Sequence, residues 1–200
     1  MAEARPAAEA IPESRSTSRR IPTSRRGVRR WSRLARLRIL RSMDMHIHDR
    51  FREHHALRRA RLPLPGQACH VTVVTRGRQR WFEDFHVACE AVRSFRQPAV
   101  LEDASLLAWV LMPDHAHWLL EPGPSTSMEK VVSRMKAAAG VQVNRMLARA
   151  GPLWATAFHG YPLDEAEDLR SVARRLVASP LREGLVERIG DYPFWDSVWL

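Results

Sequence analysis

Two histidines, His115 and His117, stand two residues apart in the segment 110–122, which reads VLMPDHAHWLLEP. The segment is apolar except at Pro113-Asp114, so it predicts a strand, a tight turn and a return strand. Residues i and i+2 of a strand face the same side, which places both imidazoles side by side. Two neutral imidazoles can bind a divalent metal and leave positions open for a phosphoryl oxygen.

The His-x-His pattern by itself is a weak signal, because such pairs also occur as incidental residues of a core or a sheet edge. Asp114 precedes the pair, and strand alternation puts its carboxylate on the opposite face unless the turn rotates it. Four further histidines lie among arginines in residues 44–62, at spacings that fit no standard ligand set: His46, His48, His54 and His55. That stretch is typical of a solvated, weakly structured lead-in rather than a metal cluster.

The elements that must position the pair follow from apolar periodicity and turn residues. The expected strands are residues 70–75, 105–112, 115–121 and 153–159. The expected helices are residues 84–95, about 127–150 and 168–178. The order is strand, helix, hairpin, helix, strand, helix. It predicts an α+β fold, a ferredoxin-like split βαβ domain with a four-stranded antiparallel sheet and an extra C-terminal helix.

Charge divides the chain unevenly. Residues 1–42 hold twelve arginines against three glutamates, whereas residues 43–200 hold 20 basic and 19 acidic residues. We therefore predict a basic, largely disordered extension over residues 1–54, with a short amphipathic helix at 31–40, and one folded domain over 55–200. Such an extension suits a phosphate backbone, although an arginine-rich composition without a ligand explains the charge nearly as well.

Several classes of protein are disfavoured by the sequence. It contains no apolar run long enough to span a bilayer and no secretory signal, which predicts a cytoplasmic protein without a membrane partner. The two cysteines, Cys69 and Cys89, are far apart and lack any CxxC spacing. They predict reduced structural thiols rather than a disulfide framework or a zinc-thiolate site.

The segment VLMPDHAHWLLEP resembles the histidine–hydrophobic–histidine (HUH) motif of the single-tyrosine transposases, in particular the REP-associated tyrosine transposases. Similar stretches follow in family order over about residues 55–200: residues 57–82, 152–163 and 168–200. The resemblance implies binding of single-stranded or hairpin DNA. It also implies Mg²⁺ or Mn²⁺ held by the two histidines, and a tyrosine on the late helix that attacks the phosphate. The product is a 5′-phosphotyrosine link with a free 3′-OH.

The chain departs from this family pattern on the late helix. The position of the nucleophilic tyrosine holds Arg175, and the position one turn later, where an amide would complete the metal shell, holds Ser179. Arginine stays protonated and cannot act as a nucleophile, but it can grip a phosphate. Tyr161 is a weak candidate for a substitute nucleophile, whereas Tyr192 is expected to pack in the core. His159 matches a histidine of the family, for which we expect a structural or DNA-contacting role.

Basic side chains near the expected DNA path are Arg76, Arg78 and Arg80 after the first strand, with Lys136 on the long helix. Arginines beside Trp81 and Phe82 suit single-stranded DNA, because charge follows the backbone and rings stack on bases. A solvated loop carrying two core aromatics explains the same residues equally well.

Two functions of different class remain open. One is a metal-dependent enzyme that cleaves and rejoins single-stranded hairpin DNA, impaired because of Arg175. The other is a catalytically inactive module that binds such DNA. A protein-interaction or RNA-binding domain on the same fold has the weakest support. Monomer and homodimer are equally compatible with the sequence.

Overall fold

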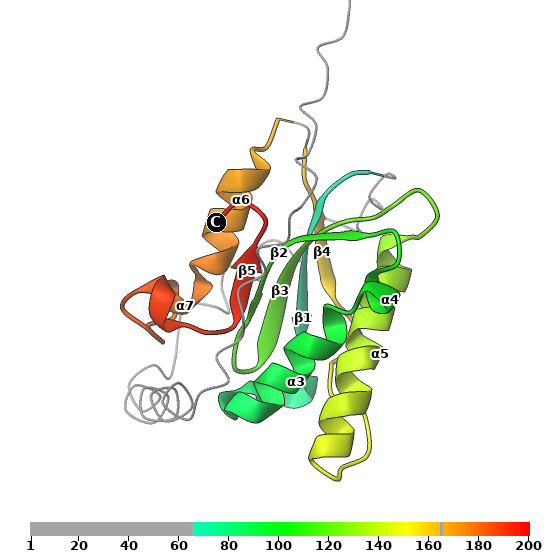
Figure 1. Cartoon of the computed structure of the whole chain (residues 1–200), viewed down its shortest axis with the longest axis vertical. Coiled ribbons are helices and arrows are strands. Elements are labelled where there is room, and N and C mark those ends of the chain that lie inside the picture. The colour runs from blue at the N-terminus through cyan, green and yellow to red at the C-terminus, as the bar shows by residue number, and fades with distance from the viewer. Residues whose placement is uncertain (1–65, 165) are drawn as a thin grey trace, which may run out of the picture.

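A computed structural model describes residues 66–164 and 166–200, which fold around a five-stranded antiparallel sheet (Figure 1). The strands are β1 (Cys69–Val74), β2 (Ser105–Leu111), β3 (His115–Glu121), β4 (His159–Pro162) and β5 (Trp195–Ser197). Their order across the sheet is β4-β1-β3-β2-β5. The first four strands form the split βαβ arrangement, so the predicted α+β, ferredoxin-like fold is confirmed.

Two details of the sheet differ from the prediction. A fifth strand, β5, pairs with β2, and its three residues are too few to show a period in the sequence. The strand expected at 153–159 begins only at His159. Leu153 and Trp154 are buried in the core instead, and Trp154 makes a single isolated bridge to Thr75.

The three predicted helices form close to their expected ranges, as α3 (Phe85–Phe95), α5 (Met128–Met146) and α6 (Leu169–Val177). Shorter elements were not predicted: the α-helices α4 (Pro98–Leu101) and α7 (Ser179–Arg182), and the 3₁₀ turns η2 (Arg76–Arg78), η3 (Trp81–Glu83) and η4 (Ile189–Asp191). Aspartates cap α3 and α6: Asp84 accepts from the backbone N–H of His86 and Val87, and Asp168 from those of Arg170 and Ser171. Helix α5 ends at Met146, before the predicted residue 150, and Gly151 then adopts a positive φ.

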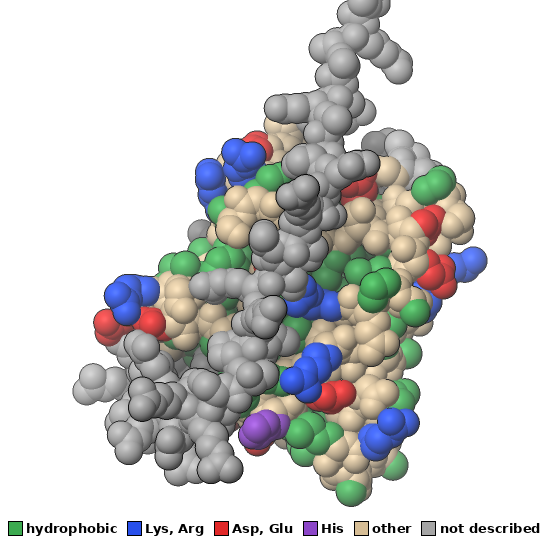
Figure 2. All heavy atoms as spheres, in the orientation of Figure 1, with side chains coloured by type: hydrophobic (Ala, Val, Ile, Leu, Met, Phe, Trp, Pro, Cys, Tyr) green, Lys and Arg blue, Asp and Glu red, His purple; other side chains and the backbone are tan. Residues whose placement is uncertain are grey.

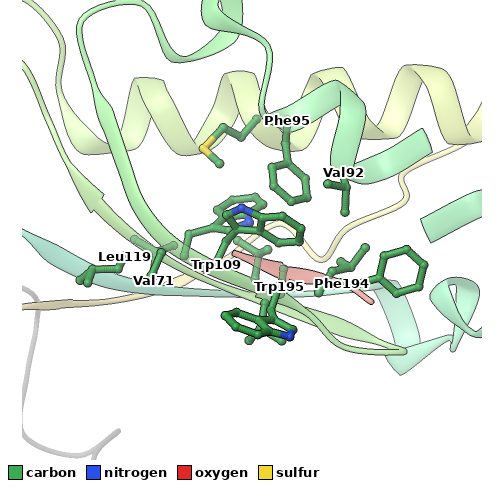
Figure 3. Close-up of a cluster of buried hydrophobic side chains, with 14 of the residues drawn as sticks. Val71, Val92, Phe95, Trp109, Leu119, Phe194 and Trp195 are labelled. Carbon is green, nitrogen blue, oxygen red and sulfur yellow. The ribbon is translucent and has the colours of Figure 1, made fainter. Parts of the chain in front are cut away.

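The sheet separates two helical layers. Helices α3 and α5 pack together on one face, while α6 contacts β2, β3 and β5 from the other (Figure 1). Phe95 of α3 lies with its ring centroid 5.3 Å from that of Trp118 and 5.5 Å from that of Trp109. Figure 3 shows Phe95 and Val92 facing the strands from the α3 side, with the Trp195 ring on the opposite face of the sheet. Alternation along β3 therefore sends Ala116 and Trp118 into an apolar core and the two histidines to the α6 side.

Charged side chains of both signs are interspersed on the part of the described surface that Figure 2 leaves uncovered. The predicted extension 1–54, its helix at 31–40 and the domain boundary at 55 lie outside the described residues. Within the part of the chain that is described, no helix has the length and apolar character to cross a membrane.

Candidate metal and nucleic-acid site

The two histidines of β3 project together. Their ring centroids are 4.9 Å apart and the ring planes are nearly perpendicular. On the neighbouring strand β1, Thr72 lies opposite His117 and Val74 lies opposite His115. His115 is only 5% exposed, whereas His117 is partly exposed. The pair therefore lies at the edge of the buried region, and His117 is the more exposed of the two residues.

Asp114 fixes the orientation of His115. The turn rotates this carboxylate toward the histidine, so Oδ1 lies 2.6 Å from Nδ1 of His115, and Oδ2 accepts from Arg78 at 3.2 Å. Burial alone would raise the pKa of Asp114, but the hydrogen bond and charge of His115 and the guanidinium of Arg78 outweigh it, and the pKa is lowered. An ionised carboxylate on Nδ1–H leaves Nε2 of His115 as the free ligand atom, the usual arrangement around metal-binding histidines.

Thr72 and His70 surround the other ring. Nδ1 of His117 lies 3.0 Å from the Thr72 hydroxyl and 3.2 Å from Nε2 of His70. Both neighbours can accept from Nδ1–H, which would leave Nε2 of His117 free to bind a cation. Burial, followed by the charges of His115 and His70, lowers the pKa of His117 well below its ordinary value. Burial, with Arg182 and Arg175, lowers the pKa of His70 to about 4. The rings of His117 and His70 are therefore neutral at pH 7, and a neutral ring is what metal binding by His117 requires.

The segment from α6 to α7 brings cations to the same face. Arg175 is exposed, and its charge reaches His70. Arg182 donates to the backbone carbonyl of Arg175 and, at 2.7 Å, to the Ser179 hydroxyl. Ser179 is buried, and its hydroxyl donates to the Leu176 carbonyl at 2.8 Å. The Ser179 hydroxyl is thus engaged within its own helical turn and in holding Arg182.

Glu183 is a candidate ligand that sequence reasoning missed. Its Oε1 lies 3.7 Å from Nε2 of His115. Burial is the largest influence on this carboxyl and raises its pKa, although the charge of His115 opposes the shift. No spacing rule could have identified Glu183, because its position depends on the chain turning from α6 into α7 at Ala178. The hydrogen bonds of Thr72 and Asp114 to the histidines likewise depend on strand register and turn geometry.

These donors fit a divalent cation as an open site. Two imidazoles present free Nε2 atoms, and the carboxylate of Glu183 stands beside one of them. Among the described residues, no three His, Cys, Asp or Glu side chains already form a complete metal-binding group. His115, His117 and Glu183 would hold such a cation, which would supply Lewis-acid chemistry toward an oxygen atom of a phosphate.

The four predicted DNA-binding cations lie in different environments. Arg78 pairs with Asp114 beside the histidines, and Arg80 pairs with Glu83. Arg76 is exposed and lines a cavity together with Gln79, Trp81 and Arg149. Lys136 lies on α5, in the opposite layer, where its ammonium donates to the carbonyls of Ala155 and Thr156 at 2.7 and 2.9 Å. Burial lowers the pKa of Lys136. Arg78 is therefore the member of this set that touches the histidine centre.

The remaining candidates lie at the margins of the site. Tyr161 pairs with His70 and His159 pairs with Thr72 across β4 and β1, so both are on the edge strand of the histidine face. Tyr161 is 38% exposed. Tyr192 is buried and its hydroxyl donates to the Leu111 carbonyl at 2.6 Å, in keeping with the predicted packing role.

Comparison with known proteins shows which family the sequence matches. Residues 65–174, more than half of the chain, match the model of the family described as "Transposase IS200 like". The structure is similar to that of a REP-associated tyrosine transposase bound to a REP hairpin, with a TM-score of 0.55 and 18% identity over 69% of this chain and 81% of that one. It also matches a transposase-like structure from Deinococcus radiodurans R1, with a TM-score of 0.43 and 21% identity over 60% of this chain and 94% of that one. No curated protein matches the sequence.

Proposed function

The chain belongs to the IS200-like transposase family, and we propose that it binds single-stranded hairpin DNA at a Mg²⁺ or Mn²⁺ centre with impaired strand cleavage. A transposase family assigns the chain to DNA transposition. The finer proposal rests on one observation. His115 and His117 face the same side while Asp114 and Thr72 contact their Nδ1 atoms, so that both Nε2 atoms are available.

Each surrounding side chain has a distinct task in this proposal. Asp114 holds the ring of His115, and Arg78 holds Asp114. Glu183 supplies the carboxylate that completes a three-ligand set, the place that the family resemblance gives to Ser179. When bound, the cation polarises a phosphoryl oxygen and thereby stabilises negative charge at the scissile phosphate. The protein's contribution is to keep His117 neutral and to orient the donor atoms before DNA arrives.

Arg175 decides how far the reaction proceeds. Its guanidinium cannot become a nucleophile, because it keeps its proton at any physiological pH. Arg175 is exposed, so a DNA phosphate can reach it for a bidentate contact. The family reaction then stops at a bound complex, which makes an inactive single-strand DNA-binding module the second candidate. Tyr161 is the substitute nucleophile to test, because β4 places it on the histidine face.

Metal binding is tested first. We expect titration of the full chain with Mn²⁺, followed by electron paramagnetic resonance of the free ion, to show binding that is lost in His117→Ala. Glu183→Gln should weaken binding, whereas the exposed Glu187→Gln serves as the matched control and should not. Asp114→Asn should weaken binding about 10- to 100-fold, as loss of a partner behind a ligand does. Equal Mn²⁺ affinity in wild type and His117→Ala would exclude the proposed centre.

Cleavage is tested with a labelled hairpin oligonucleotide and Mn²⁺. We expect DNA binding but no covalent protein–DNA adduct with the natural chain. Arg175→Tyr should yield an adduct at residue 175, since Glu183 remains to complete the metal shell and the buried Ser179 is left undisturbed. An additional Ser179→Asn change restores the family residues fully. A strong adduct mapped to Tyr161 in the natural chain would overturn the impaired-cleavage proposal.

A further inference from the structure

Arg78 has a strained backbone in the loop that adjoins the histidine centre. Its φ is 54°, in the left-handed region, and Gly77 before it has a φ of 63°. The Gln79 backbone N–H donates to the Arg76 carbonyl at 3.5 Å, which closes a turn around these two residues. Turns with two successive residues at positive φ are dominated by glycine, asparagine and aspartate. An arginine at this position therefore carries a backbone strain that glycine would not.

The side chain of Arg78 reaches the carboxylate that orients His115. Its Nη1 donates to Oδ2 of Asp114 at 3.2 Å, while Oδ1 of the same carboxylate lies 2.6 Å from Nδ1 of His115. The Asp114 side chain is only 13% exposed, so water competes little for its oxygen atoms. Each oxygen of this carboxylate is thus held by a different neighbour. The contact with Arg78 therefore fixes the rotation of the carboxylate that the His115 ring depends on.

Backbone hydrogen bonds hold the loop against the turn that contains Asp114. The Thr75 backbone N–H donates to the Asp114 carbonyl at 2.8 Å, and the Arg78 backbone N–H donates to the Thr75 carbonyl at 3.1 Å. Thr75 is buried, and its hydroxyl donates to the Gln79 carbonyl at 2.7 Å. A strained residue persists only where the surrounding structure determines its conformation in this way.

Two other residues of the described chain have a positive φ without being glycine, Glu102 and Ala148. Ala148 follows the end of α5, where a left-handed residue commonly ends a helix. Glu102 follows α4 and pairs with Arg134 at 2.9 Å. Of these three residues, Arg78 is the one that contacts a partner of a candidate metal ligand. Strained residues cluster at functional sites, which favours a role for Arg78 in the histidine centre.

We propose that Arg78 is a positioning residue of the metal centre, held in a strained backbone conformation so that it orients Asp114 and, through it, His115. The inference rests on the proposed function, in which His115 is a metal ligand. Its consequence has the opposite sign to simple electrostatics. An arginine near a cation repels it, so removal of that charge alone should strengthen Mn²⁺ binding. If Arg78 acts by orienting Asp114, its removal weakens Mn²⁺ binding instead.

The variant Arg78→Gly removes the guanidinium and relieves the strain in one change. The urea midpoint of the full chain should equal that of wild type or exceed it. The dissociation constant for Mn²⁺ should rise about threefold to tenfold, less than in Asp114→Asn, because Arg78 is one contact further from the ligand. Ala148→Gly is the matched control, since it relieves strain of the same kind away from Asp114, and should leave Mn²⁺ affinity unchanged.

A double-mutant cycle tests whether Arg78 acts through Asp114. In the Asp114→Asn background, adding Arg78→Gly should weaken Mn²⁺ binding no further, because the carboxylate that Arg78 orients is already gone. A second measurement does not depend on the metal. Long-range ¹H–¹⁵N NMR spectra of the metal-free chain report which ring nitrogen of His115 carries the proton. We expect Nδ1–H in wild type and in Ala148→Gly, and a smaller Nδ1–H population in Arg78→Gly.

The outcomes separate this inference from the proposed function. If wild type binds Mn²⁺ and Arg78→Gly binds it equally well or more tightly, the positioning role is wrong while the proposed centre stands. A further loss on adding Arg78→Gly to Asp114→Asn, as large as in wild type, would also overturn it, because Arg78 would then act without Asp114. A urea midpoint of Arg78→Gly clearly below that of wild type would make Arg78 a stabilising residue and not a strained one. If wild type binds no Mn²⁺, the proposed function fails, and an unchanged Nδ1–H population of His115 in Arg78→Gly would show that Arg78 orients nothing.

Discussion

The two faces of the sheet use the same strands for opposite purposes. On the face toward α3 and α5, Trp118, Ala116 and Phe95 are fully buried and contact other apolar groups. On the face toward α6, alternate residues of β3 are His115 and His117, beside His70 and Thr72 of β1. One face is packed with apolar side chains, and the other holds the polar side chains of the candidate site.

The difference indicates that one face contributes mainly to stability and the other mainly to the candidate site. Burial of apolar area stabilises the first face by about 25 cal/mol per Å². The second face gains less, because it buries polar groups. Burial and the charge of Arg182 both lower the pKa values of His70 and His117. Strongly shifted pKa values of this kind are typical of functional sites. Substitutions on the two faces should therefore separate stability from binding.

The largest effect is expected for Trp118→Ala. The side chain is fully buried, so its removal should cost about 3–5 kcal/mol of unfolding free energy. His117→Ala, one residue away on the other face, should cost only about 1 kcal/mol, the range for lost hydrogen bonds. Urea denaturation of both variants checks the contrast.

Trp118→Phe supplies the control. Among the described residues the Trp118 indole N–H has no hydrogen-bond partner, so phenylalanine removes an unsatisfied donor and should cost clearly less than alanine. Equal destabilisation by Trp118→Ala and His117→Ala would contradict the view that the α3 and α5 face contributes more to stability than the histidine face.

The second effect is a loss of stability at high pH. Burial raises the pKa of Cys69 to about 12 and that of Cys89 to about 11, from an ordinary value of 9.0. Above pH 9 the unfolded thiols lose protons that the folded thiols keep, so stability falls as pH rises. At pH 10 the loss should be on the order of 1 kcal/mol for each thiol. Urea curves at pH 8 and pH 10 for wild type and Cys69→Ala/Cys89→Ala measure it. If the two curves shift in parallel, the thiols are not responsible.

The third effect concerns the C-terminal segment. The Tyr192 hydroxyl donates to the Leu111 carbonyl at 2.6 Å inside the core. Tyr192→Phe removes this hydrogen bond and should cost about 1–2 kcal/mol. Binding of Mn²⁺ should be unchanged, because the hydroxyl that is removed donates to a backbone carbonyl and phenylalanine keeps the aromatic ring. Thermal and urea unfolding monitored by circular dichroism measure the loss, and a stability equal to wild type would show that this hydrogen bond contributes nothing net.

The sequence allowed prediction of those parts that depend on local periodicity. The hairpin carrying His115 and His117, the helix over 84–95 and the helix over 168–178 all follow from alternation, turn residues and caps. The strand β5 could not be predicted, because its pairing with β2 joins residues far apart in the sequence and three residues show no period. The position of β4 was misplaced because Leu153 and Trp154 are as apolar as strand residues but pack into the core.

The sequence predicted which residue types form the candidate site, but it did not predict the contacts between residues that are far apart in the chain. The facing of the two histidines follows from strand alternation. The contact of Glu183 with His115 requires the turn between α6 and α7, and the contact of Thr72 with His117 requires the register of β1 on β3. The rotation of Asp114 toward His115 depends on the turn, which the sequence left undecided. These contacts arise from tertiary structure, and no local pattern encodes them.

The smallest effects come from a matched pair of helix caps, one in each layer. Asp84 caps α3 over the apolar core and Asp168 caps α6 over the histidine face. Asp84→Ala should cost about 1 kcal/mol of unfolding free energy, as N-cap removal does, and leave Mn²⁺ and DNA binding unchanged. Asp168→Ala should lower the unfolding free energy by a similar amount. It should also loosen helix α6, which carries Arg175 and leads into Glu183. Hairpin DNA and Mn²⁺ should therefore bind more weakly to Asp168→Ala alone, measured well below its melting temperature. Equal loss of binding in both variants would mean that the two layers are coupled and that the α6 face is not an independent functional surface.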